Sequence, residues 1–245
     1  MPGGPGAELT ADAIVCCQFG RLARLRLLVE QKGVLSNAVD KDGCSLLHWA
    51  AINGHARITE YLLSQGADPN NSGGVLDEIP LQWAAREGKL QVMRLLVDAG
   101  SRLEHVNVQG RTVLHTAVLQ QRRNVLLFLL AYGADPFVTD QDDMTPLSWC
   151  CRYRPGALKI VQVLARFSRS RINYQDRHLR NTALHWAVQC STAQTSAAAP
   201  GAHGDTDPSL SGAMATRRQM VTRASLLSGA EAVKVLLGIG RLRRL

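Results

Sequence analysis

Three histidines with similar neighbours are the first residues in this chain that could do chemistry. His48, His115 and His185 each follow a leucine within a short repeated motif. An imidazole can bind zinc or transfer a proton near neutral pH, but a zinc site needs several ligands close together. Each of these histidines belongs to a different repeated segment. We therefore predict that each one hydrogen-bonds its neighbouring turn, and we predict no metal site and no cofactor.

The cysteines and the known catalytic signatures do not indicate catalysis either. None of the six cysteines forms a C-x-x-C pair, and neither Cys16-Cys17 nor Cys150-Cys151 has an adjacent histidine that would activate a thiolate. The G-x-S-x-G, H-E-x-x-H and G-x-x-x-x-G-K-[ST] signatures do not occur. We predict no catalytic residues and expect the cysteines to be small buried hydrophobes in a reducing compartment.

Tryptophans at one position of the repeated motif indicate binding instead. At about 100° per helical residue, Trp49 lies roughly 200° from Leu47 and shares its face with Asn53, as Trp83 does with Glu87. We expect an exposed aromatic column on the inner, concave surface, which would suit recognition of a partner. Partial burial between adjacent repeats is the alternative. The four tryptophans at this position are Trp49, Trp83, Trp149 and Trp186.

The motif recurs with a period that identifies the fold. Its second residue falls at positions 48, 82, 115, 148 and 185, so the steps are 34, 33, 33 and 37 residues. A period near 33 with a T-P-L-H-x-A core is the ankyrin signature. The sequence therefore predicts an all-α ankyrin-repeat solenoid of about six helix-turn-helix repeats, a class of protein that binds and rarely catalyses.

Glycines and apolar runs place the expected helices within residues 8–189. A degenerate first unit spans about 8–40 with a helix over Ala11–Phe19, and residues 1–7 are expected to be a flexible N-terminus. Gly20, Gly54 and Gly88 are expected to end the first helices of their units. The second helices are predicted at the apolar runs Leu25–Val29, Ile58–Leu63, Val92–Val97, Val125–Leu130 and Ile160–Leu164.

The sixth repeat is interrupted. Residues 190–227 are rich in Ala, Ser, Thr and Gly, and joining Gln189 to Ser228 restores the repeat pattern without a gap. We predict a disordered insertion at 190–227, followed at 228–245 by the second helix of repeat six and a basic tail. The insertion is either untranslated sequence retained in a gene model or a genuine flexible loop.

The net charge of +8 is unevenly distributed. Residues 1–149 are slightly acidic, whereas residues 150–180 are strongly basic. A nucleic-acid partner is not expected, because the basic groups do not run along the whole chain. The basic region is expected either to face an anionic membrane surface or to be an ordinary solvated face. Its candidate contact residues are Arg152, Arg154, Lys159, Arg166, Arg169 and Arg171.

Four segments give a more specific resemblance. Asp40–Asn53, Gly73–Ala84, Met144–Trp149 and Asn181–Val188 resemble repeats two, three, five and six of the ankyrin-bearing DHHC palmitoyltransferases of the huntingtin-interacting type. The similarity covers about residues 12–189, and also 228–240 if the insertion is removed. Tryptophan in four of the five recognisable motifs is more than a generic ankyrin protein would show.

The resemblance implies a peptide-binding site. In that family the cytosolic ankyrin domain precedes a membrane-embedded, zinc-dependent acyltransferase domain, and it recruits substrates through segments in which β-branched residues precede Gln-Pro. By the family motif, the Asn and Trp that read Gln and Pro fall on Asn53 and Trp83. The chemistry agrees, since an Asn amide can pair with Gln and an indole can stack on Pro. Phe19 and Asp42 stand where the family has Tyr and Glu, and Gln82 replaces the usual His. The predicted peptide-binding residues are Asn53, Trp83, Phe19, Asp42, Trp49 and Glu87.

The chain differs from that family beyond its repeats. It contains no D-H-H-C motif, no apolar run long enough for a membrane span and no signal peptide, so we expect no acyl transfer by this polypeptide alone. It is expected to be cytoplasmic, at the cytosolic face of Golgi or other endomembranes if it belongs to a longer enzyme. The leading interpretation is a substrate-recruiting module of a protein S-acyltransferase, and the alternative is a generic ankyrin scaffold with an unrelated partner.

Overall fold

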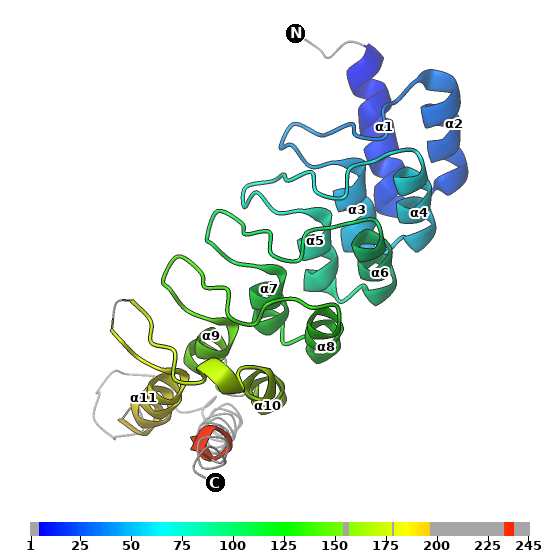
Figure 1. Ribbon diagram of the computed structural model, residues 1–245. Helices are drawn as coiled ribbons and strands as arrows, with labels where there is room; N and C mark the ends of the chain where they lie inside the picture. Colours follow the sequence, from blue (N-terminus) through cyan, green and yellow to red (C-terminus); the bar gives the residue numbers. More distant parts are fainter. Residues whose placement is uncertain (1–4, 154–156, 178, 197–232, 238–245) are drawn as a thin grey trace, which may run out of the picture. The chain divides into compact units, whose positions relative to one another are not determined.

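The computed structural model describes residues 5–153, 157–177, 179–196 and 233–237 (Figure 1). Within those ranges the chain is helical, with two isolated bridges and no strand, which confirms the all-α prediction. It divides into unit 1, residues 1–135, and unit 2, residues 136–245. Unit 1 contains α1 (Pro5–Phe19), α2 (Leu22–Lys32), α3 (Leu46–Asn53), α4 (Ala56–Ser64), α5 (Pro80–Glu87), α6 (Leu90–Asp98), α7 (Val113–Leu119) and α8 (Arg123–Ala131). Unit 2 contains α9 (Pro146–Tyr153), α10 (Leu158–Phe167), η1 (Arg169–Arg171) and α11 (Ala183–Ser196).

Helices of unit 1 alternate between two layers. The inner layer is formed by α1, α3, α5 and α7, and the outer layer by α2, α4, α6 and α8 (Figure 1). We call the loop from each outer helix to the next inner helix a finger; in unit 1 these are residues 33–45, 65–79 and 99–112. Gly54 and Gly88 follow α3 and α5 with φ of 80° and 73°. This left-handed conformation ends a helix, and glycine adopts it without steric strain because it has no β-carbon. The predicted helix ends are confirmed.

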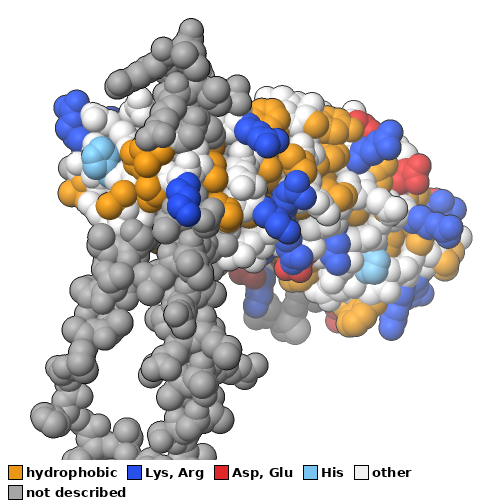
Figure 2. Space-filling model, turned by 90° about the horizontal axis from the view of Figure 1, so that it is seen from below, with side chains coloured by type: hydrophobic (Ala, Val, Ile, Leu, Met, Phe, Trp, Pro, Cys, Tyr) orange, Lys and Arg blue, Asp and Glu red, His pale blue; other side chains and the backbone are white. Residues whose placement is uncertain are grey.

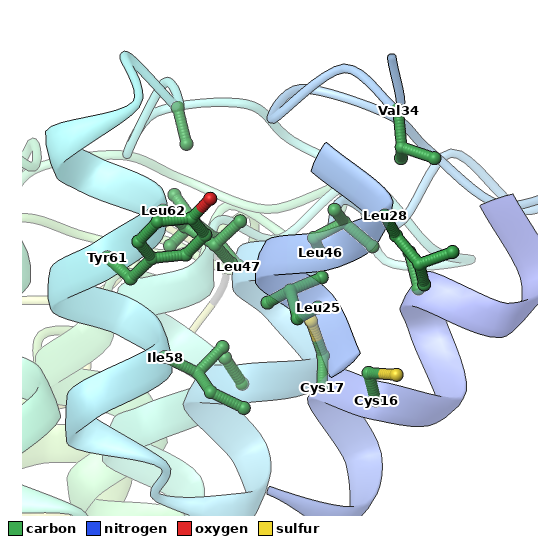
Figure 3. Close-up of a cluster of buried hydrophobic side chains, with 13 residues drawn as sticks. Cys16, Cys17, Leu25, Leu28, Val34, Leu46, Leu47, Ile58, Tyr61 and Leu62 are labelled. Carbon is green, nitrogen blue, oxygen red and sulfur yellow. The ribbon is translucent and has the colours of Figure 1, made fainter. Parts of the chain in front are cut away.

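An apolar core joins the two layers over α1 to α4 of unit 1 (Figure 3). Cys17 from α1, Leu25 from α2, Leu47 from α3 and Leu62 from α4 are all fully buried there. The small side chains of α3 on this side, such as Ala50, allow the neighbouring helices to approach closely. The packing fixes the opposite side of α3, which carries Trp49, toward the fingers.

Basic side chains link successive repeats at the other edge of unit 1. His55 places Nε2 3.1 Å from the Gln18 carbonyl oxygen, and Arg122 donates from Nε to the Arg86 carbonyl oxygen at 3.3 Å. Between them, Lys89 packs over the glycine that ends α3. These three side chains, which we call the basic rungs, lie at the ends of inner helices, where the last carbonyls have no partner within the helix. Figure 2 shows separate Lys and Arg side chains on one face of the molecule.

The first helix begins earlier than the predicted Ala11. It starts at Pro5, within the segment 1–7 whose flexibility stays a prediction. Proline at the first helical position has the required φ and lacks only an N–H that would be unpaired there. Residues 1–4 lie outside the described residues.

The first helix of repeat six also runs further than predicted. In unit 2, α11 continues to Ser196, into the segment 190–227 that was expected to be disordered. The inner helices α3 and α5 end at a glycine, and no glycine follows Gln189 to end α11 in the same way. Residues 197–227 lie outside the described residues. Residues 233–237 are helical and bury Leu236, but their assignment to the second helix of repeat six stays a prediction.

Candidate functional site

Buried polar side chains hold the fingers in place. His48 accepts a hydrogen bond at Nδ1 from the Ser45 backbone N–H at 2.9 Å, while its Nε2 lies 2.8 Å from the Glu78 carbonyl oxygen in the next finger. His115 and His185 accept from the backbone N–H of the residue three positions earlier in the same manner. These contacts confirm the structural role that was predicted for the histidines.

Gln82 does in the third repeat what histidine does in the second. The Ile79 backbone N–H donates to Gln82 Oε1 at 3.1 Å, and Gln82 Nε2 donates to the Arg111 carbonyl oxygen at 3.1 Å. The side chain is fully buried. Gln82, which stands in place of the usual His, therefore makes the same kind of bridge between fingers.

An aspartate in finger 33–45 binds both its own loop and a tryptophan. Asp40 accepts at Oδ1 from the backbone N–H groups of Asp42 and Cys44, at 2.9 and 2.8 Å. Its Oδ2 accepts from Trp49 Nε1 at 3.0 Å. A carboxylate that accepts three N–H groups fixes the finger and the indole in one arrangement.

Trp49 and Trp83 lie against each other between the second and third repeats. Their ring centroids are 5.7 Å apart at an interplanar angle of 86°, an edge-to-face contact. Trp83 also contacts the His48 ring, with centroids 5.1 Å apart. Both tryptophans are half-buried, and Asn53 is exposed one turn further along α3, donating from Nδ2 to the Trp49 carbonyl oxygen at 2.9 Å. The structure therefore brings Asn53, Trp49 and Trp83 together.

The predicted exposed aromatic column is wrong in unit 2. Trp149 and Trp186 are only 4% and 6% exposed. Trp186 donates from Nε1 to Asp176 Oδ2 at 2.9 Å, and Arg152 stacks 4.2 Å from the centre of its ring. Neighbouring side chains cover these rings, although helix geometry places them on the face that the sequence indicated.

The other predicted site residues form a row beside the tryptophans. Phe19, Asn53 and Glu87 are the last residues of α1, α3 and α5, three inner helices that lie side by side. Phe19 is 67% exposed, and the Arg21 guanidinium lies 5.6 Å from its ring centre. Glu87 is exposed and lies 3.9 Å from an Arg122 nitrogen.

Finger 65–79 contributes residues that the sequence interpretation did not assign to the site. Gly74 has φ of 75°, and a β-carbon there would lie 3.5 Å from Trp83 Cζ2. Its backbone N–H donates to the Asp42 carbonyl oxygen at 2.9 Å, which places exposed Asp42 against the next finger. The Gly73-Gly74 pair was visible as part of the family resemblance, but its contact with Trp83 depends on how the fingers pack.

The described cysteines are buried, as predicted. All five are buried and free. Burial raises the pKa of the Cys17 thiol to about 12, and burial together with Asp40 raises that of Cys44 to about 11. A thiol with such a pKa carries almost no thiolate at neutral pH and is a poor nucleophile. Among the described residues no cluster of His, Cys, Asp and Glu could hold a metal ion.

A small pocket in unit 2 lies beside Trp186, which has the same position in its repeat as Trp83. It has a volume of about 310 Å³. Two aspartates and an arginine contribute to its wall beside three apolar side chains. The lining residues are Asp142, Met144, Arg152, Asp176, Leu179 and Trp186.

Basic residues of unit 2 have varied surroundings. Lys159 and Arg166 are exposed on α10, whereas Arg152 is half-buried against aromatic rings and Arg171 stacks 5.1 Å from the ring centre of Phe137. Arg154 and the side chain of Arg169 lie outside the described residues. No helix in the described ranges combines the length and the apolar character needed to cross a membrane.

Comparison with known proteins identifies the class. A profile of ankyrin repeats, described as three copies, matches residues 9–73 and 71–140. This match covers more than half of the chain, and it agrees with the paired helices, the fingers and the His48-type anchors. The chain belongs to the ankyrin-repeat family, and the predicted fold is confirmed.

Several curated relatives are palmitoyltransferases. The chain is 36% identical over 177 residues to the putative palmitoyltransferase ZDHHC13 of Danio rerio, covering 72% of this chain and 27% of that protein. It is 36% identical over 179 residues to palmitoyltransferase ZDHHC17 of Homo sapiens, and 33% identical over 177 residues to palmitoyltransferase Hip14 of Drosophila melanogaster. These matches cover 73% and 72% of this chain, and 28% and 27% of the relatives. The chain thus spans about a quarter of their length, and its similarity is consistent with the ankyrin region of such an enzyme. It is a protein-binding repeat module.

Proposed function

We propose that this chain is the substrate-recruiting ankyrin module of a protein S-acyltransferase, and that it binds extended segments in which β-branched residues precede Gln-Pro. The observation that carries the proposal is the half-buried indole of Trp83, held by Trp49 and His48 with exposed Asn53 nearby. An aromatic ring with a polar neighbour suits the Gln-Pro pair. Similarity to palmitoyltransferases supports the choice of partner.

Hydrogen bonding leaves Asn53 suited to the glutamine. Its Nδ2 donates to the Trp49 carbonyl oxygen, and its Oδ1 accepts no hydrogen bond within the described part of the chain. An amide has two donor hydrogens and one acceptor oxygen, so one N–H and the oxygen remain for a Gln side chain. The helix-bound N–H keeps the Asn53 rotamer fixed, which reduces the entropy lost on binding.

The direction of the bound segment follows from these two contacts. If Gln meets Asn53 on α3 and Pro meets Trp83 on α5, residues before Gln extend toward α1. Three extended residues span about 10 Å, which is about the distance between packed helices. The β-branched pair would then meet Val15 and Phe19, which are 36% and 67% exposed. An apolar platform there suits branched aliphatic side chains.

Binding of a labelled Val-Val-x-x-Gln-Pro peptide to the 245-residue chain, measured by fluorescence anisotropy, tests this proposal. We expect a Kd of about micromolar, weakened by roughly tenfold or more in Asn53→Ala and Trp83→Ala. The matched control is Gln120→Ala, which changes an exposed residue next to the end of α7 and should bind normally. A folded chain that ignores the peptide, or variants that bind as well as the control, would favour a generic scaffold with another partner.

Membrane location is a separate part of the proposal. A recruiting module of an S-acyltransferase would work at the cytosolic face of Golgi or other endomembranes. Exposed Lys159 and Arg166 are the residues of the basic region best placed to meet anionic headgroups. Co-sedimentation with vesicles containing phosphatidylserine should fall in Lys159→Glu/Arg166→Glu. Sedimentation that does not depend on anionic lipid would contradict this role.

A further inference from the structure

Tryptophan N–H groups and finger aspartates form a recurring pair in both units. In unit 1, Asp40 Oδ2 accepts from Trp49 Nε1 at 3.0 Å. In unit 2, Asp176 Oδ2 accepts from Trp186 Nε1 at 2.9 Å. In each case the other carboxylate oxygen accepts backbone N–H groups of the finger. The aspartate therefore satisfies its tryptophan internally and withdraws the indole N–H from any ligand.

The third repeat lacks this aspartate. Asp40 and Asp176 precede their tryptophans by nine and ten residues, and the residues nine and ten before Trp83 are Gly74 and Gly73. The indole N–H of Trp83 donates no hydrogen bond within the described part of the chain, and the indole nitrogen is not sealed from solvent. The indole N–H of Trp83 is an unpaired donor at the edge of a half-buried ring.

Packing explains why both of these positions are glycine. A β-carbon at Gly73 would lie 2.3 Å from the Gly43 carbonyl oxygen, so the two fingers meet backbone to backbone. A β-carbon at Gly74 would lie 3.4 Å from Cys44 Sγ and 3.5 Å from Trp83 Cζ2. Cζ2 is next but one to Nε1 in the indole, so the missing side chain leaves space at the N–H edge of the ring.

The surrounding contacts keep that donor in a fixed direction. His48 and Trp49 both meet the Trp83 ring edge-to-face, with interplanar angles of 74° and 86°. A ring held on two sides does not turn to find an internal acceptor. A fixed donor that is not paired internally is suited to a hydrogen bond with a ligand.

We infer that the Trp83 indole N–H donates a hydrogen bond to a main-chain carbonyl of the bound segment, and that Gly74 determines this specificity by leaving the donor free. The inference rests on the proposed function. An extended segment containing proline has carbonyls without internal partners, and proline itself supplies no competing N–H. One indole thus offers a surface for the proline ring and a donor for the adjacent carbonyl.

Nuclear magnetic resonance of the indole N–H groups in the full chain tests the inference directly. The four tryptophans give four indole signals, and Trp83→Phe identifies the one of interest. Without peptide, the Trp83 signal should exchange with water faster than those of Trp49 and Trp186. Saturating Val-Val-x-x-Gln-Pro peptide should shift the Trp83 signal and slow its exchange by about tenfold or more.

Variants separate the hydrogen bond from stacking. Trp83→Phe keeps a ring without the donor and should weaken binding by about tenfold, the worth of one hydrogen bond, whereas Trp83→Ala should weaken it further. Gly74→Asp should bind its own indole and weaken peptide binding by tenfold relative to Gly74→Ala, which has the same backbone strain without an acceptor. Circular dichroism checks that each variant is folded.

The outcomes distinguish the two proposals. Peptide binding that leaves the Trp83 signal unchanged, or equal affinities for Trp83→Phe and the unsubstituted chain, overturns the hydrogen bond and leaves the recruiting function intact. If both Gly74 variants prevent folding, the exchange rates and Trp83→Phe still decide. A folded chain with no affinity for the peptide overturns both.

Discussion

Trp83 in unit 1 and Trp186 in unit 2 occupy the same position of the repeat but have opposite surroundings. Trp83 is half-buried, lies beside a glycine and contacts two aromatic rings. Trp186 is 6% exposed, donates to Asp176 and is covered by the Arg152 guanidinium. A finger residue accounts for much of this difference. The Asp176 carboxylate accepts the indole N–H of Trp186, whereas Gly74 has no side chain that could accept the indole N–H of Trp83.

The pocket beside Trp186 differs from the Trp83 face in the charge of its lining. Its wall includes Asp142, Asp176 and Arg152, all charged. Binding an apolar proline there would remove water from charged groups without replacing their hydrogen bonds, which is unfavourable. We therefore expect Gln-Pro segments to prefer the Trp83 face by a wide margin.

Replacing each tryptophan by alanine should give the largest contrast. Trp83→Ala is expected to weaken peptide binding by about a hundredfold with a modest loss of stability, because the half-buried ring contacts the ligand. Trp186→Ala should leave binding unchanged and destabilise unit 2 by roughly 3–5 kcal/mol, since a buried indole is removed. Anisotropy and urea unfolding measure the two effects. Equal effects on binding would remove the distinction between the units.

Removing a finger aspartate should have the next largest effect. Asp176→Ala leaves the N–H groups of Leu179 and Trp186 without their acceptor, which should destabilise unit 2 by about 2–3 kcal/mol. Asp40→Ala leaves three N–H groups unpaired and should cost unit 1 at least as much. Urea unfolding followed by tryptophan fluorescence checks both. Unchanged midpoints would show that water replaces the carboxylates without loss.

Acid should weaken unit 1 through His48. Burial lowers the pKa of His48 below its usual 6.5, so the unfolded chain takes up a proton more readily than the folded one. This stability is complete above pH 6.5 and is lost as pH falls from there toward the folded pKa, by up to about 1 kcal/mol per pH unit.

The chain itself supplies the control for this effect. Gln82 makes the same bridge as His48 and cannot titrate. His48→Gln should therefore keep the bridge at pH 7.5 and show a smaller loss of unfolding free energy between pH 7 and pH 5. An identical pH dependence in the two proteins would mean that another group is responsible.

Adding a hydroxyl group at Phe19 should have the smallest effect. Phe19 is 67% exposed and its edge is open to water, so Phe19→Tyr adds a solvated group beside an apolar contact. We expect the peptide Kd to change by less than about threefold. Competition anisotropy is sensitive enough to measure this. A change of tenfold would show that the β-branched residues do not meet Phe19 through apolar contact alone.

Local patterns predicted the helices well because helix ends depend on nearby residues. The period placed every inner helix from α3 to α9, and Gly54 and Gly88 take the left-handed conformation expected of them. The row formed by Phe19, Asn53 and Glu87 could also be found, since each residue ends an inner helix at a regular spacing.

Burial of the tryptophans could not be predicted in the same way. Helix periodicity correctly placed Trp186 opposite the apolar side, but whether it is exposed depends on Asp176 and on Arg152 from another helix. The role of Gly74 likewise depends on the packing of one finger against the next. These contacts join residues of different elements, and a helical period contains no information about them.

The basic rungs have a consequence for how the chain is made. The carbonyl of Gln18 near the end of α1 meets His55, 37 residues later, and that of Arg86 meets Arg122, 36 residues later. Because each helix end is covered by the repeat that follows it, synthesis from the N-terminus leaves the newest inner helix incomplete until the ribosome has produced another repeat. Translation should therefore stabilise unit 1 one repeat behind the growing end.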